Sequence, residues 1–389
     1  MTASAFGADP DGHLLVASGS HDGTVRLWDP LTRAPASQPL QGHTGPVRNM
    51  AFGADLDGRL LLASGSEDGT VRLWDPALNV PASQQLPGHS RPVTSVAFGA
   101  DSDGRLLLAS GSEDGTVRLW DPALNAPVSQ PLLGHSWRVS SVAFGVDPDG
   151  RLLLASGSYD KTARLWNPMT GEQLGTPLSG HTSLVDTVAF GTGPGGRLLL
   201  ASGSSDGTIR LWDPQTGRPA GPLLTGHGGC LTFVTTPDGH LLLADVSIGG
   251  KLRIWNLATN GVMSEFPDDH GRVFSIAFGI VADGRRLLAT GNSDGTVRLW
   301  DPFTSTPVGR PMIGHASAVT SLVFSATTNG RLLVGSSSYQ TVRLWDPATT
   351  APVTTISRRS PISSVAAANG LLAIGDREGI SVIEVVWPM

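Results

Sequence analysis

GRLLLASGSEDGTVRLWDPALN occupies residues 58–79 and, without one change, residues 104–125. The tryptophan of this stretch belongs to a series whose consecutive members lie 43 to 46 residues apart: Trp28, Trp74, Trp120, Trp166, Trp212, Trp255, Trp300 and Trp345. Self-similarity at a fixed period means that each repeat is one supersecondary unit. The sequence therefore predicts a repeat fold with about 45 residues in each unit.

Each unit is predicted to contain four short strands, as the third unit illustrates. PVTSVAFG (92–99) is β-branched and apolar, and a polar loop separates it from LLLASGS (106–112). Asp114-Gly115 predicts a tight hairpin into TVRLWD (116–121), and APVSQPLLGH (126–135) is a looser fourth strand. Four such strands cannot bury both faces alone, so the sheets must stack around an axis. We expect an all-β fold with no helix longer than a turn or two.

The unit resembles the WD-repeat (WD40) motif over practically the whole chain, since the length, the hairpin and the Trp-Asp register agree eight times. This resemblance implies a β-propeller of four-stranded blades. An eroded ninth unit (361–385) matches the first three strands without the Gly-His or the Trp. Met1 aligns with Val47, inside a first strand, so no N-terminal strand is left to complete the last blade.

We therefore predict one β-propeller domain over residues 1–389 with nine units, the last three-stranded and degenerate; eight blades is the alternative. The predicted units are approximately 1–43, 44–89, 90–135, 136–181, 182–227, 228–270, 271–315, 316–358 and 359–389.

Bulk composition narrows the class of protein. The net charge is −6, and no run of Lys or Arg is dense enough to follow a phosphate backbone, so we expect no nucleic-acid partner. No stretch approaches 18 apolar residues, and the first residues lack the regions of a signal peptide. A lone Cys230 excludes an intramolecular disulfide. We expect a soluble, cytoplasmic, monomeric protein, and the preference for Arg over Lys suggests a bacterial, actinobacterial-like source.

The WD40 resemblance also implies a buried His–Ser–Asp–Trp network in each blade. Physically, a buried Trp N–H needs an acceptor and an Asp carboxylate needs donors. Five units supply the set: His43, Ser64, Asp68 and Trp74; His89, Ser110, Asp114 and Trp120; His135, Ser156, Asp160 and Trp166; His181, Ser202, Asp206 and Trp212; and His270, Thr290, Asp294 and Trp300.

A Ser/His/Asp set could instead indicate a hydrolase. Catalytic groups occur once, in one cleft, whereas this set recurs in five units, so we predict no catalytic residue and no enzyme activity. The network is predicted to fail in unit six, where Asp245 and Gly249 replace Ser and Asp, and in unit eight, where Gly335 and Tyr339 do. Unit one lacks the His. These blades should be the least stable.

Metal and cofactor sites are not expected. Residues 8–12, 54–58, 100–104 and 146–150 each pair two carboxylates, but calcium needs more oxygen ligands and D-x-D-G is ordinary turn chemistry. The histidines of separate blades cannot converge on one zinc ion. The glycine-rich 191–196 opens no helix, so it cannot hold a phosphate as a nucleotide-binding loop does.

Two functions remain: a non-catalytic protein-interaction scaffold, which we favour, and a small-ligand binder or enzyme that uses the central channel or one face. In the WD40 family, the hairpin between strands two and three shares a face with the loop into strand one, and this face often binds partners. Blade four diverges most there, with Trp137, Arg138 and Tyr159. These residue types are enriched at interface hot spots. The predicted rim is Arg48, Arg91, Glu67, Glu113, Leu184 and Asp186. Sequence drift, with Trp137 packed on its own loop, is the alternative.

Overall fold

The structure is a computed structural model. It describes residues 3–8, 14–29, 34–35, 38–54, 59–76, 80–81, 88–101, 103–124, 126–193, 196–225, 230–235, 241–246, 252–257, 261–266, 271–280, 286–304, 306–326, 332–339, 341–347, 349–357, 362–368, 371–376 and 379–384.

The strands of this described part form nine antiparallel sheets, which we number blades one to nine in chain order. Blades one to four contain β1 (Ala3–Ala8), β2 (Leu14–Gly19), β3 (Val25–Asp29) and β4 (Ala34–Pro35); β5 (Val47–Ala54), β6 (Leu60–Ser66), β7 (Val71–Asp75) and β8 (Val80–Pro81); β9 (Val93–Ala100), β10 (Leu106–Ser112), β11 (Val117–Asp121) and β12 (Ala126–Pro127); and β13 (Val139–Val146), β14 (Leu152–Ser158) and β15 (Ala163–Trp166).

Blades five to nine contain β16 (Val185–Thr192), β17 (Leu198–Ser204), β18 (Thr208–Asp213), β19 (Arg218–Pro219) and β20 (Leu224–Thr225); β21 (Cys230–Thr235), β22 (Leu241–Val246), β23 (Leu252–Asn256) and β24 (Gly261–Glu265); β25 (Val273–Ile280), β26 (Arg286–Asn292) and β27 (Val297–Trp300); β28 (Ser321–Ala326), β29 (Leu332–Ser338), β30 (Thr341–Trp345) and β31 (Pro352–Ser357); and β32 (Ile362–Ala368), β33 (Leu371–Asp376) and β34 (Gly379–Glu384).

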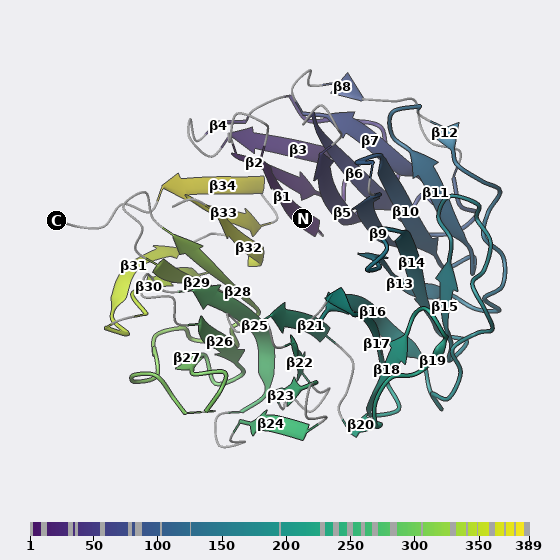
Figure 1. Ribbon diagram of the computed structural model, residues 1–389. Coiled ribbons are helices and arrows are strands. Elements are labelled where there is room, and N and C mark those ends of the chain that lie inside the picture. The colour runs from purple at the N-terminus through teal and green to yellow at the C-terminus, as the bar shows by residue number, and fades with distance from the viewer. Residues whose placement is uncertain are drawn as a thin grey trace.

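The sheets lie side by side around a common centre, and the first strand of each is nearest to it (Figure 1). Successive first strands are in contact from β1 to β21 and again from β25 to β32, and β32 also lies against β1. Blades six and seven share a core cluster that joins Leu242 to Leu288 and Trp300. The predicted all-β class is confirmed, since the described residues contain no α-helix. None of them therefore forms a helix long and apolar enough to cross a membrane.

Burial within a blade follows the strand order. All seven residues of β10 are buried, whereas β9, at the centre, is mostly half-buried. In β11 the Val, Leu and Trp side chains are buried and Arg118 is half-buried. The predicted fourth strand 126–135 is reduced to the two residues of β12 and one bridge between Val117 and Leu132. Pro131 lies between these two pairings, and proline cannot donate to a ladder.

Neighbouring blades meet through glycines. A Cβ on Gly65 would lie 2.6 Å from Val93, and one on Gly53 would lie 2.7 Å from Phe98 of the same following blade. The same pairing recurs at Gly99 and Phe144, where the distance would be 2.4 Å. Only a residue without a side chain lets the next first strand approach this closely. These glycines, which we call glycine notches, therefore set the distance between blades.

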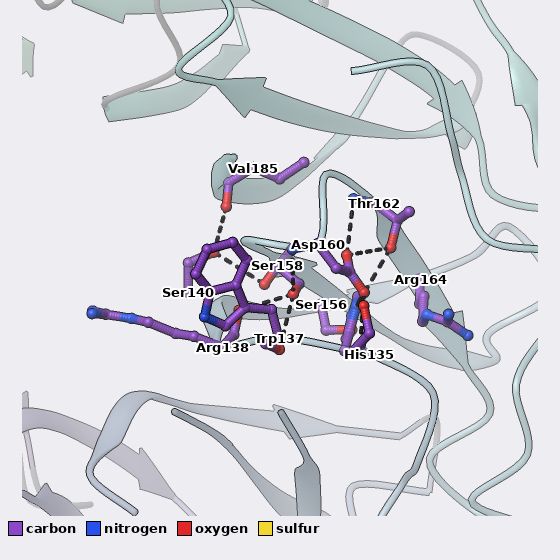
Figure 2. Close-up of polar contacts among 12 residues, drawn as sticks. His135, Trp137, Arg138, Ser140, Ser156, Ser158, Asp160, Thr162, Arg164 and Val185 are labelled. Atoms are coloured by element: carbon purple, nitrogen blue, oxygen red, sulfur yellow. Dashed lines mark hydrogen bonds and ion pairs between the residues drawn. The ribbon is translucent and has the colours of Figure 1, made fainter. Parts of the chain in front are cut away.

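Hydrogen bonds also join the inner strands. The Ser140 hydroxyl in blade four lies 3.0 Å from the Gly157 carbonyl and 2.6 Å from the Val185 carbonyl of blade five (Figure 2). Thr94 makes the equivalent bonds from blade three, with 2.6 Å to the Val139 carbonyl of blade four. A backbone carbonyl in a packed interior needs a donor, and these hydroxyls supply it.

Candidate functional site

The predicted polar network is present in blade three. Trp120 Nε1 donates to Ser110 Oγ over 3.2 Å, and Ser110 Oγ lies 2.8 Å from His89 Nε2. His89 Nδ1 lies 3.1 Å from an Asp114 oxygen. Trp can only donate, so the serine accepts from it, and the carboxylate can only accept, so His89 Nδ1 donates to it. The same chain of bonds occurs in blades two, four and five.

The structure adds a threonine that sequence reasoning missed. Thr116 donates to Asp114 through its amide, over 2.9 Å, and through its hydroxyl, over 2.7 Å. The Ser90 amide donates to the other carboxylate oxygen over 3.0 Å. Burial alone would raise the pKa of Asp114, but the bonds from His89 and Thr116 outweigh it and hold this pKa well below its usual range. A Thr follows the hairpin residue in every intact unit, and that repetition was the available signal.

These networks connect loops and do not form active sites. Ser110 is fully buried, and so is the side chain of His89, so the hydroxyl cannot reach a substrate. Each Asp instead fixes its own hairpin to the loop that leads into strand one. The His, Ser and Asp of these blades are therefore structural.

Blade eight contradicts the sequence prediction. Gly335 and Tyr339 were predicted to replace the network residues, but Trp345 Nε1 donates to Ser336 Oγ over 2.8 Å, and His315 Nε2 lies 2.7 Å from the same oxygen. The segment between this serine and the Trp is one residue shorter than in blades two to five, so counting ten residues back from Trp345 gives Gly335 instead of Ser336. The serine follows the histidine by 21 residues in blade eight, as it does in blades two and three. The prediction was therefore wrong for the serine.

Blade eight does lack the aspartate. His315 Nδ1 lies 2.8 Å from Thr341 Oγ1 in its place, and Tyr339 is exposed. Burial, together with the charge of Arg343, lowers the pKa of His315 to about 4. The imidazole is therefore neutral at ordinary pH.

Blade six keeps part of the predicted network. Trp255 Nε1 donates to Asp245 Oδ1 over 3.1 Å, so the aspartate takes the acceptor role of the serine. Asp245 is fully buried, and its other oxygen has no partner among the described residues. Burial raises the pKa of Asp245 to about 7 against the opposing effects of Trp255 and Arg253. Gly249, and His270 of blade seven, lie outside the described residues; Trp300 Nε1 there donates to Thr290 over 3.0 Å, as predicted.

Blade four carries a cluster that we call the blade-four patch: Trp137, Arg138, Tyr159 and Glu113. The Trp137 and Tyr159 rings meet edge to face with centroids 6.4 Å apart. The Arg138 guanidinium lies 5.0 Å from the centre of the Tyr159 ring and 3.1 Å from Glu113 of blade three. Trp137 is 60% exposed, and it lies beside the network residues in Figure 2. The structure thus joins four of the predicted residues in one contact cluster.

The other rim residues are arranged differently. Arg48 donates to Glu67 within blade two, over 2.7 Å from Nε. Asp186 accepts a bond of 2.6 Å from Ser205 in blade five, where the Leu184 carbonyl bonds the Ser205 amide. Arg91 is exposed in blade three, and its carbonyl accepts from Ser112. Within the described part, no hydrogen bond or ion pair joins these rim residues to the patch.

The loops between strands one and two form the opposite end of the blades. A cavity of about 960 Å³ lies there, and its lining includes Asp101, Asp147, Arg151, Asn167 and Met169. Asp101 and Asp147 each accept two amides of their own loop, which is the turn chemistry expected of D-x-D-G. In the described residues no three His, Cys, Asp or Glu side chains are placed to share a metal ion.

Comparison with known proteins identifies the family of the chain. A family model described as WD domain, G-beta repeat matches seven segments: 3–29, 36–75, 82–121, 127–167, 171–213, 262–301 and 306–346. The segments leave out most of blade six, which holds the Asp245 substitution. The comparison with curated proteins gives no match.

A solved structure supports the fold. The crystal structure of the computationally designed Ika8 protein is similar over 100% of this chain and 96% of that chain, with 24% identity and a TM-score of 0.59. At that identity the similarity concerns the fold alone. Because the repeat model covers more than half of its residues, the chain belongs to the WD40 family.

Proposed function

We propose that this protein is a non-catalytic scaffold that binds another protein through the blade-four patch. WD40 repeats generally mediate protein–protein interaction, which supports the class of function. The observation that carries the proposal is the Trp137–Tyr159–Arg138 cluster, because such residues dominate binding energy at interfaces.

The geometry of Trp137 favours binding over simple sequence drift. The alternative interpretation packs this ring onto its own loop, yet 60% of the residue is exposed and its ring contact is edge to face with Tyr159. The Arg138 guanidinium lies over the Tyr159 ring and is itself paired with Glu113. A pre-ordered exposed aromatic residue loses little conformational entropy when a partner covers it.

A small-ligand site is less well supported. The cavity at the opposite end is polar, but Asp101 and Asp147 already accept loop amides, and Asn167 accepts the Met169 amide over 2.9 Å. These groups stabilise the loops themselves. We therefore favour the scaffold.

The test is the double substitution W137A/Y159A, with F274A/Y339A as the matched control. Phe274 and Tyr339 are exposed aromatic residues of blades seven and eight; Tyr339 has the hairpin position of Tyr159, and Phe274 lies in β25. After a pull-down identifies a partner, we expect W137A/Y159A to weaken its affinity by about tenfold or more, as for hot-spot pairs, and the control to leave it unchanged. Both variants must keep the wild-type melting temperature. Equal affinity of wild type and W137A/Y159A would refute the proposed site.

We further propose that the nine sheets are nine blades of one closed ring, the ninth three-stranded. The contact between β1 and β32 supports closure. Eight blades is the alternative, and a cryo-electron microscopy projection along the axis would count them. The proposal extends to a monomeric, cytoplasmic protein of bacterial, actinobacterial-like origin, supported by the composition described above.

A further inference from the structure

The hairpin of blade four differs from the others in its backbone chemistry. The hairpins of blades two, three and five turn at Gly69, Gly115 and Gly207, with φ between 80° and 82°. Blade four has Lys161 at this place, with φ of 73°. A left-handed backbone favours glycine and is strained for any residue with a Cβ. Lysine is therefore present where the repeat would be more stable with glycine.

Lys161 differs from Arg138 and Arg48, two other cations of this face, in having no carboxylate partner within the described part. Arg138 is paired with Glu113, and Arg48 with Glu67. Lys161 and Arg91 are both exposed, and within the described residues neither side chain has a carboxylate in ion-pair range. Arg91 lies two residues after His89, the position that Trp137 has in blade four. Arg91 thus precedes the patch by one blade, and Lys161 follows Tyr159 by two residues in the blade-four hairpin, so both cations share the face of the patch.

The carboxylates nearby decide the kind of anion that fits. Glu113 and Glu67 are neutralised by their arginines, and Asp186 is held by the Ser205 hydroxyl. A nucleic acid carries one phosphate charge per residue, more than Arg91 and Lys161 can match once the arginines of the glutamates are already paired. A peptide can place its acidic side chains selectively and offer an apolar side chain to Trp137.

We infer that the partner segment bound by the blade-four patch is an acidic, extended peptide, with carboxylates toward Arg91 and Lys161 and an apolar side chain on Trp137. This inference rests on the proposed function. Arg138 is a positioning residue, since its charge is already used by Glu113 and its guanidinium holds Tyr159.

The test uses a fluorescein-labelled twelve-residue peptide of Glu, Pro and Phe, measured by fluorescence anisotropy. The same peptide with Lys in place of Glu, and single-stranded dT12, are the comparison probes. We expect the acidic peptide to bind, with an affinity that falls as NaCl rises. K161G and R91A should each weaken it about threefold to tenfold, as loss of one interface charge does. R310A, an exposed arginine outside these blades, should bind like wild type.

K161G gives a second reading that a merely structural lysine would not. Glycine relieves the left-handed strain, so the melting temperature should rise by about 2 °C while the acidic peptide binds more weakly. A structural lysine would change stability alone. K161R keeps the charge and should retain the wild-type affinity.

Three results would overturn the inference: no binding of the acidic peptide, equal binding of the Lys peptide or dT12, or unchanged binding by both K161G and R91A. The proposed function fails separately. It falls when W137A/Y159A leaves a recovered protein partner bound as tightly as before, whatever the charge of that partner.

Discussion

Blades three and six each place an aspartate within reach of a buried tryptophan network, and the two carboxylates behave in opposite ways. Asp114 receives bonds from His89, from Thr116 and from the Ser90 amide. Asp245 receives one bond, from Trp255, and its second oxygen has no partner among the described residues. The difference shows that donors, more than burial, decide whether a carboxylate stabilises this fold as an anion.

The largest expected effect is the pH dependence of blade six. The folded pKa of Asp245 is raised to about 7, above the unfolded value, so the folded chain binds more protons between these values. Stability should therefore fall by about 2–4 kcal/mol as the pH rises from 4 to 7, and change little above 7 through this group. D245S, which restores the serine of the other blades, should remove this fall and stabilise the protein at pH 8.

Urea denaturation followed by tryptophan fluorescence at pH 5 and pH 8 measures this effect, and hydrogen exchange of β22 and β23 locates it. The gain from D245S should be larger at pH 8. A gain of the same size at both values would mean that Asp245 does not titrate in this range.

Removal of a carboxylate that accepts several hydrogen bonds should cause the next largest loss of stability. D114A leaves the His89 and Thr116 donors unsatisfied and should cost about 1–3 kcal/mol at pH 7. The folded pKa of Asp114 is lowered, so its contribution is present above the unfolded value and is lost only as the pH falls through the folded value. The urea midpoint should therefore drop equally at pH 5 and pH 8. A loss confined to pH 8 would contradict the comparison.

Blade eight sharpens the comparison because it keeps the serine without the aspartate. S336A removes the acceptor of the Trp345 N–H and a partner of His315. We expect the free energy of unfolding, measured by urea denaturation, to fall by about 1–2 kcal/mol. Gly335, the residue first predicted for this role, provides no side-chain acceptor. Wild-type stability of S336A would show that the bonds to Ser336 contribute nothing.

The smallest effect is expected at Tyr339, which is 62% exposed and outside the network. Y339A should change the free energy of unfolding by less than about 0.5 kcal/mol, as exposed positions usually do. Thermal denaturation suffices as the measurement. A loss of stability comparable to that of S336A would show that Tyr339 contributes to the network.

The repeat register predicted most of this structure because most of its features depend on residues within one repeat. The hairpins, the buried second strands and four complete networks follow from residues that recur at fixed separations. The Ser336 error arose where one hairpin lost a residue, so two ways of counting disagreed. The pair of Arg138 with Glu113 joins two blades and depends on how far apart they stand, which no single repeat encodes. The left-handed backbone of Lys161 was not predicted, for another reason: lysine, unlike glycine, does not indicate this conformation.

The glycine notches have a consequence for how the gene can change. The joints between the first five blades share one shape, a glycine on one blade and a Val on the next, as at Gly19, Gly65, Gly111 and Gly157. Residues 58–79 and 104–125 are identical, and recombination between their coding sequences would remove or add one whole unit in frame. The new joint would be built from surfaces that already match. Such an event would change the number of units by one whole blade and leave the loops of the remaining units unchanged.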